Sequence, residues 1–188
     1  MTNQQFEIRI LRQHWIKDDG LDDKDDLCSH GDLYLKIGDE ILSNSESNSW
    51  CLSATGLYLL RTLKQDYSIG DFENYLVPCC GHFMVPDDEK NYVIICGCNN
   101  GIDWNIKHNN KNIELRTEKG TTGIITFEQY KNLVLDFTDK VEGFYGDPNQ
   151  KKVPNEEFDQ NGFRQFWSEW TDLKTEWKKT TYNTIYSK

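Results

Sequence analysis

Three short pairs of cysteine and histidine residues stand out in this chain of 188 residues, because thiolate and imidazole groups bind metal ions and act as nucleophiles or bases. On a strand, a spacing of one intervening residue places both side chains on the same face, so two such pairs can surround one zinc ion. Common structural zinc sites instead separate paired ligands by two or more residues. The pairs are Cys28-x-His30, Cys80-x-His82 and Cys96-x-Cys98.

The last two pairs define an alternative metal site, at Cys80, His82, Cys96 and Cys98, with Zn²⁺ as its cofactor. The same residues allow a second alternative, a thiol-dependent enzyme. His82 follows Cys80 closely enough in the sequence to serve as the base that activates its thiol. Against both alternatives, free cysteine packs as a small apolar group and is among the most often buried residue types. The stretches LVPCCGHFMV and IICGCNNGIDW are largely apolar, so we favour buried, inert thiols inside a sheet.

All six cysteines are expected to be reduced. Their spacing does not resemble a disulfide framework, and Cys79 and Cys80 are too close along the chain to pair with each other. The N-terminal sequence carries no secretory signal, and no apolar run reaches the roughly 18 residues that span a bilayer. The expected compartment is therefore the cytoplasm, where thiols stay reduced.

Known catalytic motifs are missing from the sequence. It contains no Gly-x-Ser-x-Gly elbow, no phosphate-binding loop, no His-Glu-x-x-His and no glycine-rich dinucleotide turn. The charge run KDDGLDDKDD lacks the ligand spacing and the closing glutamate of an EF-hand, so we expect a solvated acidic loop. No catalytic or cofactor-binding residue is assigned, and we expect a protein that is not an enzyme.

Charge and composition indicate a protein partner. The net charge of −10 disfavours nucleic acid, whose phosphates need a positive patch, and it suits a basic protein. The length and the 13% content of aromatic residues fit one domain, residues 1–188, with a single core. No membrane partner is expected, and the oligomeric state is left open.

The hydrophobic pattern predicts an α+β fold, in which an antiparallel sheet of about six strands, built from hairpins, is covered by two or three helices. One hairpin turns at Gly38-Asp39 and another at Asn109-Asn110. The second turn places Ile106 opposite Ile113 and keeps the apolar residues on one face. Strands are expected at residues 6–16, 32–37, 40–43, 75–78, 92–96, 102–108 and 111–117.

Three stretches have helical periodicity. The first helix has Ser49 or Ser53 as its N-cap, and Gly56 within it indicates close packing against a neighbouring element. The second begins at Thr126, which forms a capping box with Gln129. The C-terminal helix is rich in aromatic residues, with an apolar stripe at Phe163, Phe166, Trp170, Leu173 and Trp177.

Two stretches, PCCGHFMV…VIICGCNNGIDWNIKH and FYGDPNQKKVPNEEFDQNGFRQFWSEW, together resemble small bacterial proteins of the kind found as immunity proteins beside polymorphic toxins. The resemblance covers residues 30–172. It implies a non-enzymatic cytosolic protein that binds a toxin and blocks its active site or an essential surface. Many of these toxins are basic nucleases, which an acidic inhibitor complements in charge.

The predicted contact surface is acidic, with one aromatic anchor. Trp167 lies off the apolar stripe of the last helix and would anchor an interface if exposed. Charge reversal of the acidic loop is expected to slow association and flatten its salt dependence. An interaction module without a toxin partner is a further alternative. The predicted contact residues are Asp22, Asp23, Asp25, Asp26, Asp87, Asp88, Glu89 and Trp167.

Overall fold

The computed structural model describes residues 5–44, 49–87, 89 and 92–179. Its helices are α1 (Leu52–Thr62), α2 (Phe127–Tyr145) and α3 (Glu157–Lys179), with a short 3₁₀-helix η1 (Pro148–Gln150) before α3. The predicted α+β class and the aromatic-rich C-terminal helix are confirmed within these residues. The strands are β1 (Phe6–His14), β2 (His30–Ile37), β3 (Glu40–Ser43), β4 (Trp50–Cys51), β5 (Val77–Pro78), β6 (Phe83–Asp87), β7 (Tyr92–Cys96), β8 (Gly101–Ile102), β9 (Trp104–Asn109), β10 (Asn112–Thr117) and β11 (Thr122–Thr126).

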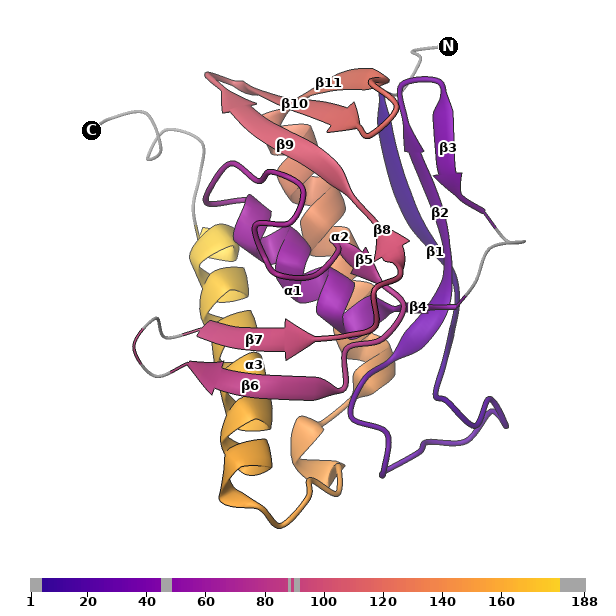
Figure 1. Cartoon of the computed structure of the whole chain (residues 1–188), viewed down its shortest axis with the longest axis vertical. Coiled ribbons are helices and arrows are strands. Elements are labelled where there is room, and N and C mark those ends of the chain that lie inside the picture. Colours follow the sequence, from indigo (N-terminus) through magenta and orange to yellow (C-terminus); the bar gives the residue numbers. More distant parts are fainter. Residues whose placement is uncertain (1–4, 45–48, 88, 90–91, 180–188) are drawn as a thin grey trace.

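The strands form several small antiparallel sheets in place of one sheet of about six strands (Figure 1). In one sheet β2 pairs with β1, β3 and β4, and its hairpin with β3 turns at residues 38–39 as predicted. A second sheet has the order β11-β10-β9, and β5-β8 and β6-β7 are two-stranded ribbons. The chain therefore alternates between short sheets that surround a shared hydrophobic core.

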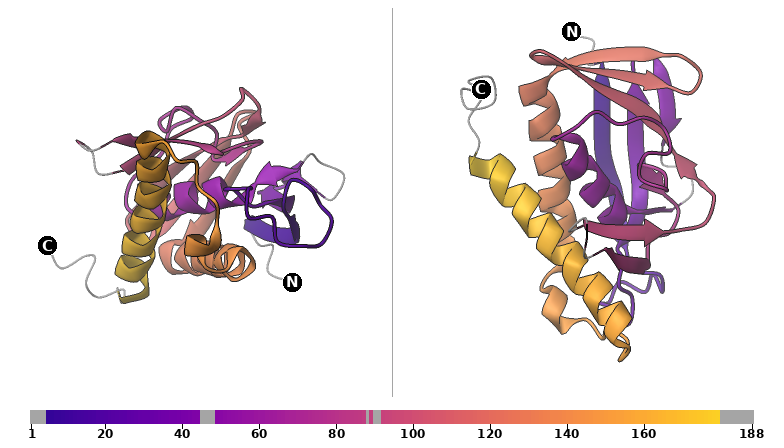
Figure 2. Two further views of the ribbon diagram at one scale, coloured as in Figure 1. Left: turned by 90° about the horizontal axis from the view of Figure 1, so that it is seen from below. Right: turned by 60° about the vertical axis from the view of Figure 1, so that its left-hand side comes forward.

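Helix α1 lies at the centre of the molecule, where it packs against α2 and α3 (Figures 1 and 2). Ten of its eleven residues are buried, which fits its mostly apolar sequence. A Cβ atom added to Gly56 would lie 2.5 Å from the Trp170 ring of α3. The prediction that Gly56 marks close packing is confirmed, because only a residue without a side chain lets α3 approach this closely.

The β9–β10 hairpin forms as predicted, but the predicted register is wrong. Asn109 pairs with Asn112, so the turn is at residues 110–111, one residue later than expected. Ile106 consequently lies opposite Leu115. The register has shifted by two residues, which is the side-chain period of a strand, so the apolar face stays on the core side.

The first residue of α2 is determined by side chains that are neighbours in the sequence, and the first residue of α1 by the pairing of strands. Thr126 caps α2 and forms the predicted capping box with Gln129. At α1 the N-cap is Cys51, not Ser49 or Ser53, and its side chain makes no capping hydrogen bond. The start of α1 is set by the pairing of β4 with β2, so the sequence signal for a serine cap misled the prediction.

Candidate functional site

A cavity of about 980 Å³ is lined by most of the histidines and by several of the cysteines of the chain. It lies between the loop that joins β1 to β2, the segment 79–84 and the first turns of α3. Three of the four histidines of the chain line it, at positions 14, 30 and 82, together with Cys28, Cys79 and Cys80. The lining residues lie at positions between 14 and 163 of the sequence. The fold, and not a local sequence motif, therefore brings them together.

Residues 15–29 form the acidic loop, which extends beyond the ends of β1 and β2 (Figure 1). Lys151, whose side chain is 1% exposed, fixes this loop to the α2–α3 linker. Its Nζ atom donates to the Asp22 carboxylate at 2.8 Å and to the Asp23 carbonyl at 2.8 Å, and lies 3.2 Å from the centre of the Trp15 ring. The loop is thus held by a buried cation and its chain path is well defined.

The four aspartates predicted as contacts all have charged partners within the chain. Asp23 and Asp26 are buried, at 6% and 8% exposure, and the first pairs with Lys17 and the second with His30. These two residues hold the loop together and do not lie on its outer surface. The side chains of Asp22 and Asp25 are 51% and 63% exposed, so a direct contact with a partner falls to them.

The other predicted contacts are dispersed. Asp87 binds Gln165 of α3 through its main chain, Glu89 is exposed, and Asp88 lies outside the described residues. Trp167 is partly buried, with its ring 4.5 Å from that of Tyr145, so much of its surface packs on the core. Their role as contacts stays a prediction.

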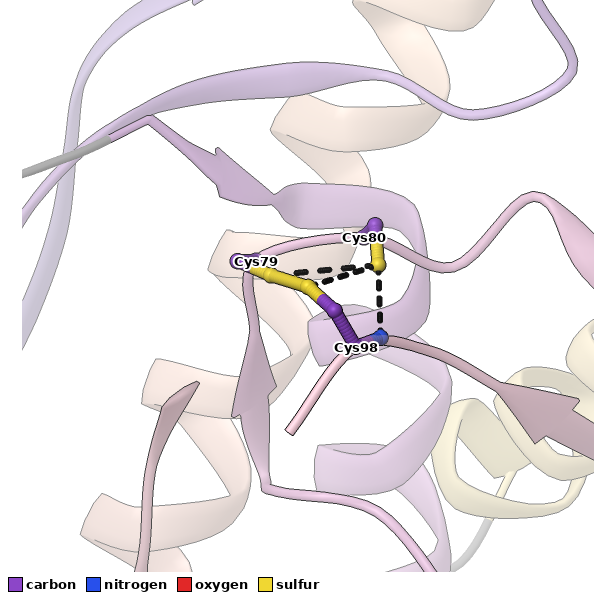
Figure 3. A group of neighbouring side chains, drawn as sticks. All are labelled: Cys79, Cys80 and Cys98. Carbon is purple, nitrogen blue, oxygen red and sulfur yellow. Dashed lines mark hydrogen bonds between the residues drawn. A yellow bond between two sulfur atoms is a disulfide. The ribbon is translucent and has the colours of Figure 1, made fainter. Parts of the chain in front are cut away.

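Cys79, Cys80 and Cys98 form the thiol cluster (Figure 3). Cys79 and Cys98 are joined by a disulfide, which corrects the prediction that all six cysteines are reduced. The Cys80 Sγ atom lies 3.1 Å from Cys98 Sγ and accepts a hydrogen bond from the Cys98 N–H at 2.9 Å. No local pattern in the sequence indicates this bridge, because it forms where the turn after β5 meets the turn after β7.

Cys80 Sγ lies beside the disulfide, 3.1 Å from Cys98 Sγ and 3.8 Å from Cys79 Sγ. Attack of a thiolate on a disulfide sulfur needs the three sulfur atoms in line. The thiol cluster is therefore not arranged for disulfide exchange as it stands.

The predicted zinc set of Cys80, His82, Cys96 and Cys98 is not assembled in the described residues, where only Cys80 and Cys98 share a cluster. Cys96 is exposed at the end of β7 and His82 is exposed at the cavity. The prediction of a buried sheet interior is also wrong here, because Cys80 is half-buried and Cys98 is exposed. Strands β5 and β7 end two residues before Cys80 and Cys98, respectively. The apolar pattern therefore predicted burial for residues that lie in the turns just beyond the strands.

We expect the four free thiols to react in three groups. Cys96 should react with a thiol reagent quickly, Cys80 more slowly, and the buried Cys28 and Cys51 only after unfolding. Titration of the native and the unfolded chain without reductant measures this. The variant Cys96→Ser should lose the fast phase alone. Six reactive thiols in the unfolded, unreduced chain would show that the disulfide is not formed.

A second group, which we call the buried cluster, lies deeper in the cavity and consists of Asp26, Cys28, His30 and Cys51. His30 Nε2 is 3.4 Å from Asp26 Oδ2 and 3.7 Å from Cys28 Sγ, and Cys28 Sγ is 3.7 Å from Asp26 Oδ1. Cys51 is fully buried and its Cα is paired with that of His30 across β2 and β4. Only the Cys28-x-His30 pair was foreseen as ligands from the sequence.

The residues of the buried cluster perturb one another. A hydrogen bond with Cys28 and the N–H of Ala54 lower the pKa of Cys51 to about 7, against the effect of burial. The hydrogen bond with Cys51 and burial together raise the pKa of Cys28. Burial lowers the pKa of His30, but the Asp26 carboxylate outweighs it and the net pKa is raised. Cys51 is therefore the more easily ionised thiol of the two, and it lies beside a histidine whose pKa is raised.

His14 and Ser49 form a further pair on the same cavity that the sequence did not indicate. The Ser49 hydroxyl is 2.9 Å from His14 Nε2, and His14 Nδ1 is 2.9 Å from the Trp15 carbonyl, which fixes the tautomer that accepts from serine. This is the geometry of a nucleophile and its base. The orienting group is a neutral carbonyl and stabilises an imidazolium less than the carboxylate of a catalytic triad does.

Asp103, which lies away from the cavity, is a buried carboxylate that makes stability depend on pH. Its carboxylate accepts hydrogen bonds from the Tyr67 hydroxyl at 2.9 Å and from the N–H groups of Leu76 and Trp104. Burial raises the pKa of Asp103 to about 6, despite these hydrogen bonds. The folded chain therefore binds this proton more tightly than the unfolded chain does, and the associated stability is lost as the pH rises through 6.

We expect the free energy of unfolding to fall by roughly 2 kcal/mol on account of Asp103 between pH 4 and pH 7.5, since one pKa unit corresponds to about 1.4 kcal/mol. Urea unfolding at a series of pH values measures this. Asp103→Asn cannot ionise and should remove this part of the slope, whereas Asp136→Asn on the surface of α2 should keep it. An unchanged slope in Asp103→Asn would contradict the assignment.

No protein-family model, curated protein or solved structure matches this chain. Among the described residues, none of the helices is both long enough and apolar enough to cross a membrane.

Proposed function

We propose that this chain is a non-enzymatic binding factor for a basic protein, of the kind represented by immunity proteins that neutralise toxins. The observation that carries the proposal is the exposure of Ile16 and Leu21, at 71% and 70%, on a loop that a buried lysine holds in place. Exposed aliphatic side chains on a well-ordered loop are typical of a binding epitope. A loop already held in shape also loses little conformational entropy when a partner binds.

The apolar surface continues around the mouth of the cavity. Ile16 and Phe83 line the cavity, and Phe83 is 47% exposed. The Phe158 ring of α3 lies 6.3 Å from that of Phe83 and is itself 46% exposed. Interface anchors are typically large apolar side chains around a pocket that a partner residue fills. We call Ile16, Phe83 and Phe158 the apolar rim.

The charge around the apolar rim favours a basic partner. The exposed carboxylates of Asp22 and Asp25 lie on the same loop as Ile16, and Asp159 lies at the cavity beside Phe163. The net charge of −10 adds a long-range attraction that speeds association at low salt. We therefore propose a partner that inserts an apolar side chain flanked by lysine or arginine.

The experiment uses site-specific photo-crosslinking in the native host. A photoreactive side chain replaces Ile16, Phe83 or, as a control, Ile41 of β3, which is 53% exposed and contributes nothing to the cavity lining. The proposal predicts one basic protein that is crosslinked from the first two positions only and that binds the unmodified chain after purification. The same products from all three positions, or a product that the purified chain does not bind, would overturn it.

The nature of the crosslinked protein separates the two binding alternatives. A toxin whose activity is lost on binding supports the immunity proposal, and a basic protein without toxicity supports an interaction module. Asp25→Lys should slow association with either, since Asp25 pairs only loosely with Lys152 at 3.3 Å.

A further inference from the structure

We propose that Asp26, Cys28, His30 and Cys51 bind one zinc ion. This site differs from the set expected from the sequence, and it lies beneath the apolar rim and not in it. The four residues come from the end of the acidic loop, the first residue of β2 and the last residue of β4. A zinc ion here would join residues 26–30 to Cys51, which lies more than twenty residues further along the chain.

Three of the ligand atoms already have the spacing that zinc imposes. With Zn–S near 2.3 Å and Zn–N or Zn–O near 2.0 Å, the edges of a coordination tetrahedron are roughly 3.3–3.8 Å long. The corresponding separations are 3.7 Å for Cys28 Sγ to His30 Nε2 and 3.4 Å for His30 Nε2 to Asp26 Oδ2. Cys28 Sγ lies 3.7 Å from the other oxygen of Asp26. The three side chains therefore lie close enough to bind one ion, and Cys28 and His30 approach different oxygens of the Asp26 carboxylate.

Cys51 supplies the fourth ligand. It is directly opposite His30 in the β2–β4 pair, and its thiol has to move towards the other three ligands, which by themselves lie within 4.8 Å of one another. Cys51 is 0% exposed, whereas Asp26, Cys28 and His30 line the cavity. The cavity thus gives the ion a path in, and Cys51 closes the site from the core side. Four protein ligands are typical of a structural zinc site.

The donor set selects the metal. Two thiolates, one imidazole and one carboxylate combine soft, borderline and hard donors, and zinc accepts all three in a tetrahedron. Calcium and magnesium prefer oxygen ligands, and copper(I) prefers thiolates. Because the ligands are buried, thiolate charge there needs compensation, which a divalent cation provides.

The surroundings hold the ligands in orientation. Asp26 accepts hydrogen bonds from the main-chain N–H of Ile16 at 2.8 Å and of Cys28 at 3.2 Å. Gly81 lies directly over Cys51, since a Cβ atom added to Gly81 would be 2.9 Å from Cys51 Sγ. Such contacts from neighbouring groups are what orient ligands in metal sites.

The thiol cluster of Cys79, Cys80 and Cys98 is the rival site for a metal, because its sulfur atoms also lie within ligand spacing when reduced. Zinc K-edge X-ray absorption of the unaltered, reduced chain separates the two sites without any substitution. The buried cluster predicts two sulfur neighbours near 2.3 Å and two nitrogen or oxygen neighbours near 2.0 Å. Three sulfur neighbours would assign the metal to the thiol cluster and overturn the proposal.

The complementary experiment is metal analysis of the purified full-length chain after loading with Zn²⁺ and removal of excess ion. We expect about one zinc per chain, at least a tenfold loss of zinc affinity in Cys28→Ser, and no loss in the matched controls Cys96→Ser and Cys80→Ser. Absence of zinc from the unaltered chain, or loss of zinc in Cys80→Ser with retention in Cys28→Ser, would overturn the proposal. If Cys28→Ser does not fold, the absorption spectrum of the unaltered chain still decides.

Discussion

Replacement of Lys151 by alanine is expected to lower the free energy of unfolding by about 2–4 kcal/mol and to release the acidic loop. The substitution leaves the buried Asp23 carbonyl without its lysine donor, at about 1–3 kcal/mol, and removes a desolvated cation–π contact with Trp15, at about 2 kcal/mol. The loss of the desolvation cost of a buried ammonium offsets part of this sum. Urea unfolding gives the change in stability.

The neighbouring residue provides the control. Lys152→Ala removes only an exposed pair with Asp25, in which both side chains are more than half exposed, so we expect a change below about 0.5 kcal/mol. Amide hydrogen exchange in residues 15–29 should become faster in Lys151→Ala alone. Equal stability of the two variants would mean that Lys151 does not hold the loop, and the pre-organised epitope would lose its physical basis.

Gly162→Ala is expected to destabilise the chain by about 3 kcal/mol or more, although alanine is the better helix former. Gly162 lies in α3 where this helix crosses β6, and an added Cβ would lie only 1.9 Å from the Met84 carbonyl oxygen. The helix would have to move away from main chain that cannot yield easily. The gain in helix propensity, about 1 kcal/mol, is smaller than the cost of this overpacking.

Gly143→Ala is the matched control, because it lies within α2 and a Cβ there meets nothing within 4 Å. We expect it to stabilise the chain by about 0.5–1 kcal/mol through helix propensity. Thermal unfolding should thus move in opposite directions for the two glycine variants. A stabilised Gly162→Ala variant would contradict the described packing of α3 on β6.

Local structure was largely predictable from the sequence, because its signals act over a few residues. The capping box at Thr126 and the hairpin at residues 38–39 depend on side chains that are neighbours along the chain. The β9–β10 hairpin shows the limit of such signals. The apolar pattern fixed which face points inwards, but it could not decide between registers that differ by two residues.

The candidate site was not predictable in the same way, because it is assembled from distant segments. His14, His30 and Cys51 lie side by side on β1, β2 and β4, because β2 pairs with both of the other strands. The pairing of Cys51 with His30 and the disulfide at Cys79 have no local signal.

The acidic loop illustrates a second limit. A run of aspartates predicts a solvated surface. Asp23 and Asp26 are nevertheless buried, and they pair with Lys17 and His30, respectively. Their partners Lys17 and His30 are near in sequence, but Lys151, which anchors the loop, is more than a hundred residues away. Charge alone therefore overstated how much of this loop is available to a partner, and the apolar rim was missed.

The most direct test of the proposed function is the affinity of the crosslinked partner for two matched variants, measured by calorimetric titration. Ile16→Asp places a charge at the centre of the apolar rim, and Ile41→Asp places the same charge on an exposed isoleucine of β3. We expect Ile16→Asp to weaken binding at least tenfold, or by about 1.4 kcal/mol, and Ile41→Asp to leave it unchanged. Unchanged affinity in Ile16→Asp would contradict the account.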